Sequence, residues 1–159
     1  MQPARLSISI LMLNRLMIEE YCGDDYDKII KIWELSVKAT HSFLSEYDFN
    51  IIKERLPDCL SGVKLFVYIK GETIAAFMGI KDCKLEMLFC HPRFFRQGIS
   101  RAMVKYATDV LNIRFIDVNE DNTGAIDFYK SLGFEIYGRK GADDFGYPIL
   151  LLKLPNTII

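Results

Sequence analysis

Three β-rich segments that follow one another at hairpin spacing constrain the fold of this chain most strongly. They cover residues 64–69, 73–80 and 84–90, and only short turns at 70–72 and 81–83 separate them. Parallel neighbours need a crossover of a dozen or more residues, so connections this short imply an antiparallel meander. The meander disfavours a doubly wound parallel sheet.

The rest of the chain predicts helices before and after the meander. Apolar residues recur at helical spacing in both places, and Pro57 and the Ser61–Gly62 pair are expected to end the second helix. The expected elements are strand 16–21, helix 26–39, helix 49–56, the three strands of the meander, helix 99–111, strand 115–119, helix 125–132 and strands 134–139 and 147–154. This order predicts an α+β (mixed α/β) fold, with one central, mostly antiparallel sheet of about seven strands flanked by about four helices.

Length and charge exclude several classes of protein. The chain has 159 residues, which suits one domain, and its formal net charge is −1. No basic stripe favours nucleic acid, and no apolar stretch approaches the ~18 residues of a membrane span. Residues 1–15 hold a short, interrupted apolar stretch, so we expect them to be a non-essential extension and residues 16–159 to form a single domain.

The four cysteines, Cys22, Cys59, Cys83 and Cys90, form no CxxC pair and show no metal-ligand spacing. Three of them lie in or beside apolar runs, which predicts buried free thiols. We therefore expect a cytoplasmic protein without a metal site.

The junction between the strand at 84–90 and the helix from residue 99 has the features of an anion site. Gly98 lies in a short turn just before the helix, whose N-terminus presents unpaired N–H groups and a partial positive charge. Four cations lie nearby without an acid: Arg93, Arg96, Arg101 and Lys105. An ordinary βα turn with solvated arginines would leave the same pattern. No G-x-G-x-x-G or P-loop motif is present, which disfavours a nucleotide-binding domain.

A second group of residues begins at Asn122, where a strand meets a short helix. Ala125 and Tyr129 are four residues apart and share one face of that helix. Tyr129 could be a core residue with a hydrogen-bonded hydroxyl or a functional group in a site.

Together the two segments resemble the GNAT superfamily of N-acetyltransferases. The segment from Asn122 to Phe134 carries the family pattern N-x-x-A-x-x-F/L-Y-x-x-x-G-F in full. The cofactor loop of the family reads Q/R-x-x-G-x-G/A, and here Gly98 matches while Phe95 and Ser100 replace the first and last positions. The resemblance covers residues 16–154 and implies a V-shaped splay between the fourth and fifth strands, 84–90 and 115–119, with acetyl-CoA in the cleft.

The resemblance also implies which residues bind the cofactor. The pantetheine arm would pair with the backbone of the fourth strand, the pyrophosphate would take N–H groups from the loop, Asn122 would bind the pantetheine or orient its helix, and Phe128 would pack on the cofactor. The implied residues are Leu88, Phe89, Cys90, Arg96, Gln97, Gly98, Ile99, Ser100, Arg101, Asn122 and Phe128.

Three residues are candidates for catalysis of acetyl transfer to a primary amine. Tyr129 would donate a hydrogen bond to the departing CoA thiolate. Glu86 is the first candidate for the general base, because some family members carry a glutamate there, and a solvated strand residue is the other interpretation. His41 is the second candidate, since its imidazole titrates near neutrality, and a loop or core histidine is the other interpretation.

The acceptor is either a small-molecule amine or a protein lysine. Ser36 to Leu44, Val118 to Asn122 and Gly138 to Pro148 resemble a branch of small bacterial GNAT proteins, some of which are assigned protein-lysine or small-amine acetylation. The alternative function is a non-catalytic acyl-CoA sensor or scaffold of the same fold. The sequence leaves open whether the protein is a monomer or a homodimer.

Overall fold

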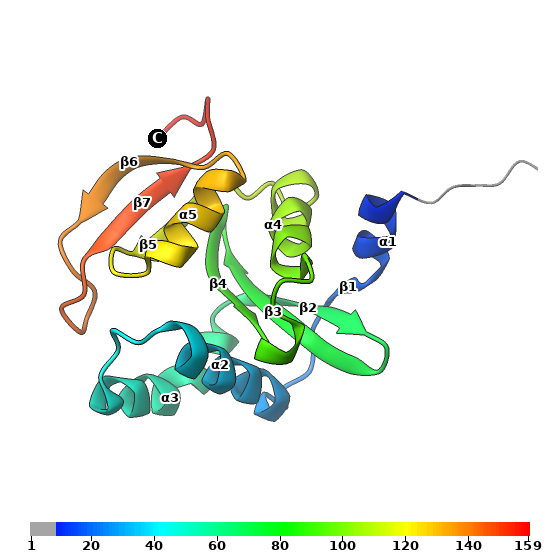
Figure 1. Ribbon diagram of the computed structural model, residues 1–159, viewed down its shortest axis with the longest axis horizontal. Coiled ribbons are helices and arrows are strands. Elements are labelled where there is room, and N and C mark those ends of the chain that lie inside the picture. The colour runs from blue at the N-terminus through cyan, green and yellow to red at the C-terminus, as the bar shows by residue number, and fades with distance from the viewer. Residues whose placement is uncertain (1–8) are drawn as a thin grey trace, which may run out of the picture.

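The computed structural model describes residues 9–159 and contains seven strands and five α-helices in that range (Figure 1). In chain order the elements are α1 (Ile10–Leu16), β1 (Ile18–Glu20), α2 (Asp27–Thr40), α3 (Glu46–Ser61), β2 (Lys64–Lys70), β3 (Thr73–Lys81), β4 (Lys84–Cys90), the 3-10 turn η1 (Pro92–Phe94), α4 (Ile99–Asp109), β5 (Phe115–Asn119), α5 (Thr123–Ser131), β6 (Glu135–Lys140) and β7 (Ile149–Lys153).

One seven-stranded sheet runs through the molecule in the order β1-β2-β3-β4-β5-β7-β6. Strands β2, β3 and β4 pair antiparallel, which confirms the meander, and β6 pairs antiparallel with β7 in the expected hairpin. Only β4 and β5 are parallel neighbours. The expected mixed, mostly antiparallel fold is confirmed.

The pairing of β4 with β5 stops almost as soon as it begins. Lys84 lies opposite Phe115 and Leu85 opposite Ile116, and no further pairs follow. On the other side of β4, Gly79 pairs with Met87 and Ile80 with Leu85, which leaves Glu86 as an extra residue in a β-bulge. Bulges bend a strand and increase its twist. The bulge therefore accounts for the expected splay, which leaves the edge of β4 beyond Leu85 unpaired toward β5.

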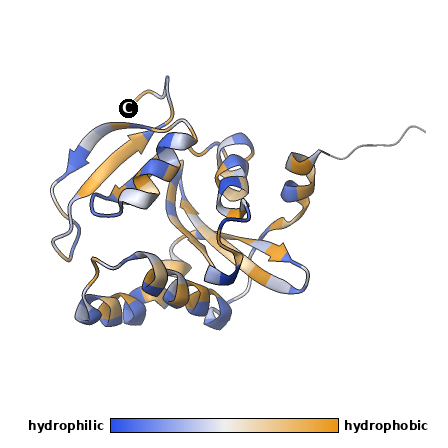
Figure 2. Cartoon of the chain, in the orientation of Figure 1, coloured by the Kyte–Doolittle hydropathy of each residue, from blue (hydrophilic) through white to orange (hydrophobic). Residues whose placement is uncertain are grey.

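Helices cover both faces of the sheet and bury two apolar clusters. Helices α4 and α5 pack on one face through Met103, Ala107 and Ile126, whereas α2 and α3 pack on the other through Ile29, Trp33 and Leu60. The helices show their hydrophobic sides inward and their polar sides outward in Figure 2. Since the layers are fixed on both faces, the open part of β4 lies between them.

Helix α1 was not expected from the sequence. Except for its last residue, it lies within residues 1–15, which we expected to be an extension and of which residues 1–8 fall outside the described residues. Its Asn14 Oδ1 accepts a hydrogen bond of 2.9 Å from the buried Tyr68, and Arg15 lies 3.5 Å from Asp109 of α4. Leu16, expected in the first strand, belongs to this helix.

Two further expectations were wrong. Pro57 does not end the second helix but lies inside α3, where the buried Leu56 and Leu60 keep the helix packed on the sheet although proline removes one N–H donor. Of the four cysteines only Cys90 is buried; Cys22, Cys59 and Cys83 are exposed because they lie in a loop, on the outer face of α3 and in a turn.

No helix in the described part of the chain combines the length and the apolar character that crossing a membrane requires.

Candidate active site

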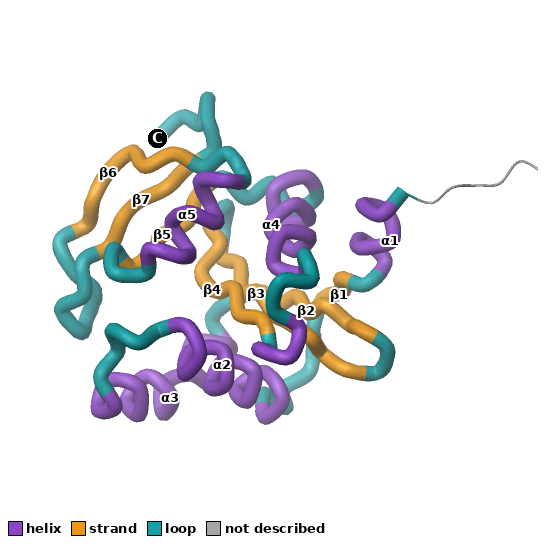
Figure 3. The backbone as a smooth tube through the Cα atoms, viewed as in Figure 1, coloured by secondary structure: helices purple, strands orange, loops and turns teal. Residues whose placement is uncertain are grey.

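The loop between β4 and α4 turns its backbone toward the splay. Arg96 and Gly98 both have positive φ angles, of 60° and 78°, and Gly98 is the N-cap of α4 without a side chain to satisfy the first N–H groups. Figure 3 shows the connection that leads from β4 into α4. A Cβ atom on Gly98 would have no heavy atom within 4 Å. The loop thus presents free backbone donors and an arginine at one place, which suits an anion.

The turn between β5 and α5 lies on the other side of the splay. Asn122 caps α5, since its Oδ1 accepts a 3.1 Å hydrogen bond from the N–H of Ala125. One helical turn beyond Ala125, Tyr129 is 8% exposed and its ring lies against Phe128 and Phe134. Its hydroxyl has no hydrogen-bond partner within the described residues, and burial raises its pKa above the ordinary value of 10. The hydroxyl therefore remains a protonated donor at neutral pH.

The β4–α4 loop and the β5–α5 turn form two walls of a cavity, and the end of α2 forms the third. His41 follows the last residue of α2, and its Nε2 lies 3.4 Å from the Nδ2 of Asn122, 81 positions along the chain. Its Nδ1 lies 2.7 Å from the hydroxyl of Thr40. Burial lowers the pKa of His41 below 6.5, so its imidazole is neutral at pH 7.

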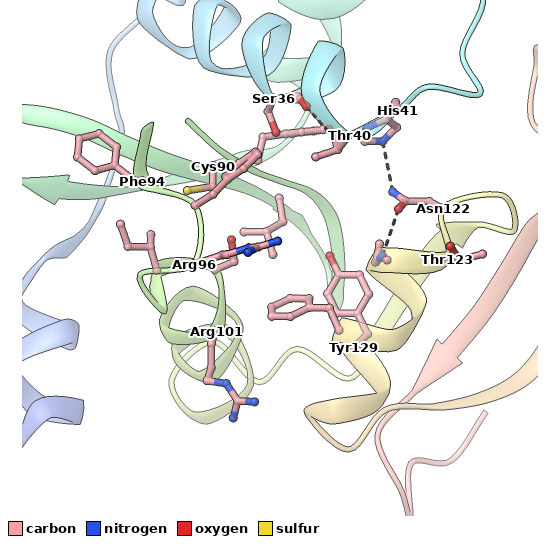
Figure 4. A pocket seen from close by; sticks show the side chains of 18 of the residues that line it. Ser36, Thr40, His41, Cys90, Phe94, Arg96, Arg101, Asn122, Thr123 and Tyr129 are labelled. Carbon is pink, nitrogen blue, oxygen red and sulfur yellow. Dashed lines mark hydrogen bonds between the residues drawn. The ribbon is translucent and has the colours of Figure 1, made fainter. Parts of the chain in front are cut away.

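These three walls enclose one cavity of about 680 Å³ (Figure 4). Two of the three predicted catalytic residues, Tyr129 and His41, line this cavity. Of the predicted cofactor-binding residues it collects Leu88, Phe89, Cys90, Arg96, Gly98, Ile99, Ser100, Arg101, Asn122 and Phe128. Figure 4 shows Arg96 directed into the cavity and the side chain of Arg101 directed away from it, so Arg101 offers only its backbone there.

Two predicted residues do not line the cavity. Glu86 is the bulged residue of β4 and is exposed. Gln97 is also exposed, and its Oε1 accepts a hydrogen bond from Lys70. The structure thus brings His41 rather than Glu86 into the cavity with Tyr129.

Cys90 lines the cavity without being a reactive thiol. It is 6% exposed, and burial raises its pKa to about 11, which the Ser100 hydroxyl only partly opposes. At neutral pH the group is a thiol and not a thiolate, so it cannot act as a nucleophile.

The cavity also contains residues that sequence analysis did not single out. They come from the same three walls, and among them are Ser36, Thr40, Phe43, Phe94, Asp121 and Thr123. Thr40 and Thr123 are neighbours of predicted residues, which was the available signal. Ser36 is 4% exposed although polar, and it precedes Thr40 by one helical turn. Phe95 is one of the residues that line the cavity, and its side chain does not fill it.

The arrangement fits a phosphate-bearing thioester. The loop at Arg96 and Gly98 can take the phosphates, the unpaired edge of β4 can pair with an extended amide chain, and the Tyr129 hydroxyl can donate to a leaving sulfur. Among the described residues no group of three His, Cys, Asp or Glu side chains could hold a metal ion.

Known proteins share both sequence and fold with this chain. The sequence model of the acetyltransferase (GNAT) domain family matches residues 61–136. A protein of Salmonella typhimurium named peptidyl-lysine N-acetyltransferase YjaB is 36% identical over 132 residues, covering 82% of this chain and 91% of the relative. The protein of that name from Escherichia coli is 31% identical over 132 residues, covering 82% and 90%. The solution structure of apo YjaB from Escherichia coli has a TM-score of 0.78 at 28% identity, covering 88% of this chain and 97% of that one.

Proposed function

The chain belongs to the GNAT family of acetyltransferases and transfers an acetyl group to an amine, and we propose that it takes the acetyl group from acetyl-CoA and delivers it to lysine side chains of proteins. The two relatives above 30% identity carry the name peptidyl-lysine N-acetyltransferase, which supports a protein lysine as the acceptor. Because both are named as enzymes, the alternative of a non-catalytic sensor is not favoured.

The residues that line the cavity suggest where the pyrophosphate and the pantetheine arm of acetyl-CoA would bind. Arg96 and the N–H groups from Gly98 to Ser100 would hold the pyrophosphate, and the backbone of Leu88 to Cys90 would pair with the pantetheine amides. Phe128 would pack against the bound chain. When bound, acetyl-CoA supplies a thioester carbonyl that an amine nitrogen can attack.

The acceptor must lose a proton before it can attack. A lysine ammonium of pKa ~10.4 costs roughly 4.6 kcal/mol to deprotonate at pH 7, so a base is useful. His41 is neutral, lines the cavity and would accept this proton at Nε2. Glu86, the first candidate from the sequence, becomes the second, because its exposed position at the bulge offers less support.

The leaving sulfur needs a hydrogen-bond donor. As the nitrogen–carbon bond forms and the carbon–sulfur bond breaks, negative charge develops on sulfur, and the Tyr129 hydroxyl would donate to it. Burial raises the pKa of Tyr129, so hydrogen bonding rather than complete proton transfer is its expected role. The arrangement that supports this proposal most directly is the Tyr129 hydroxyl, which has no hydrogen-bond partner among the described residues, in one cavity with the anion loop.

A direct test offers peptides to the purified chain with acetyl-CoA. The peptides have a blocked N-terminus and contain one lysine, and matched controls replace that lysine with arginine. We expect thiol release and a mass increase of one acetyl group on the lysine peptides alone. Release with small amines but never with lysine peptides or proteins would refute the proposed acceptor. No release with any amine would refute the use of acetyl-CoA.

A further inference from the structure

A chain of hydrogen bonds determines which nitrogen of His41 carries the proton. The Thr40 hydroxyl donates its one proton to the backbone carbonyl of Ser36, at 2.7 Å. The same oxygen lies 2.7 Å from the Nδ1 of His41, so in that contact it can only accept. Nδ1 must therefore carry a hydrogen.

The opposite side of the ring leads to the same result independently. The Oδ1 of Asn122 accepts the N–H of Ala125, which directs the Nδ2 amide group toward His41. An amide nitrogen only donates, so the Nε2 of His41 must be the acceptor across the 3.4 Å contact (Figure 4). A hydrogen on Nε2 would face another hydrogen.

We propose that Thr40 is a positioning residue that, with Asn122, holds His41 as the Nδ1–H tautomer, so that the lone pair of Nε2 is directed toward the acceptor amine. The contact from Asn122 is long for a hydrogen bond, and an incoming amine or water can replace it at Nε2. The tautomer follows from the hydrogen bonds alone, whereas its use in catalysis rests on the proposed function.

The other groups around the His41 imidazole are compatible with the Nδ1–H tautomer. The rings of Phe43 and Phe89 lie 5.2 and 6.1 Å from that of His41, and neither carries a charge. The other titratable residues that line the cavity are Asp121, Cys90, Tyr129, Arg96 and Arg101, and none of them hydrogen-bonds the imidazole. The hydrogen bonds of Thr40 and Asn122 therefore decide the tautomer.

The chain contains its own reference for a test. It has only two histidines. The Nδ1 of His91 accepts the N–H of Arg93 at 3.0 Å, so His91 must be the opposite, Nε2–H tautomer. Nitrogen-15 NMR of the imidazoles, at a pH where both rings are neutral, should show one tautomer of each kind.

Thr40→Val removes the acceptor at Nδ1 with little change in shape, and Thr40→Ser keeps it. We expect Thr40→Val to move only the His41 signals toward the Nε2–H tautomer, and Thr40→Ser to retain the wild-type pattern. Two Nε2–H histidines in the wild type would overturn the tautomer assignment. An unchanged tautomer in Thr40→Val would overturn the positioning role of Thr40, because it would show that Asn122 alone holds His41.

Kinetics separate this proposal from the proposed function. We expect kcat/KM of Thr40→Val for the amine to fall roughly threefold to tenfold, a part of the 10²–10⁴-fold that a general base contributes. The KM for acetyl-CoA should not change, and Thr40→Ser should restore kcat/KM. A shifted tautomer with undiminished kcat/KM would remove His41 from the proposed mechanism and leave the tautomer assignment standing.

Discussion

Replacing Tyr129 with phenylalanine removes one hydroxyl and keeps the ring that lies against Phe128 and Phe134. The hydroxyl has no hydrogen-bond partner within the described residues, so its loss breaks no contact of the folded protein. We therefore expect the free energy of unfolding to stay nearly unchanged. In the reaction the same hydroxyl would meet a developing thiolate in a buried site, where a hydrogen bond to a charged group contributes about 1.5–3 kcal/mol. This corresponds to a decrease in kcat of about 10- to 160-fold.

The assay follows thiol release at saturating acetyl-CoA and amine, with single turnovers measured in parallel to establish that acetyl transfer limits the rate. Tyr106→Phe is the matched control, because it removes the same atom from a ring that packs on Phe66 outside the cavity. We expect the control to keep the wild-type kcat, and Tyr129→Phe to keep the affinity for acetyl-CoA. A kcat within twofold of wild type, when transfer is rate-limiting, would refute the role of the hydroxyl.

Three other predictions concern the loop, the histidine and the thiols. Gly98→Ala places a residue with a side chain in the left-handed region, which costs about 1–2 kcal/mol, and should raise the KM for acetyl-CoA. Gly146→Ala, at a φ of 84° in the turn before β7 and outside the cavity, should lower the melting temperature alone, and equal effects on KM would contradict the loop assignment. Burial lowers the pKa of His41, so kcat/KM should rise with pH through a value below 6.5 and stay level above it. If His41→Gln shows the same rise of kcat/KM with pH, His41 is not the group that causes it. Iodoacetamide should modify the three exposed cysteines of the native protein and reach Cys90 only after denaturation, and peptide mass spectrometry can measure this. Rapid labelling of Cys90 in the native protein would contradict the prediction, because it would show an accessible thiolate.

Local patterns predicted most of the fold. The short turns at 70–72 and 81–83 permit only antiparallel neighbours, so the meander followed from chain geometry. The run from Asn122 to Phe134 combines a helix cap, a helix face and a glycine, which predicted helix α5 and the face on which Tyr129 lies.

Features that depend on contacts distant in sequence could not be predicted. A strand predicted at 84–90 does not show that Glu86 is an extra, unpaired residue in a bulge, because the bulge depends on the pairing of β4 with β3. Helix α1 is short and is held by Tyr68 and Asp109, which are far along the chain. The contact of His41 with Asn122 is of the same kind, because it arises only when the ends of two separate elements meet.

The bulge in β4 opens the sheet between β4 and β5, so that residues from the helices on both faces can reach one cavity. Ser36 and His41 reach the cavity from the layer on one face, and Arg96 and Tyr129 reach it from the other. In the proposed reaction, groups from both faces of the sheet would therefore meet the two reactants in one opening. The proposed acceptor side, at His41, and the proposed cofactor side, at Arg96, thus belong to separate layers of the fold, and a substitution in one layer should leave the other side unchanged.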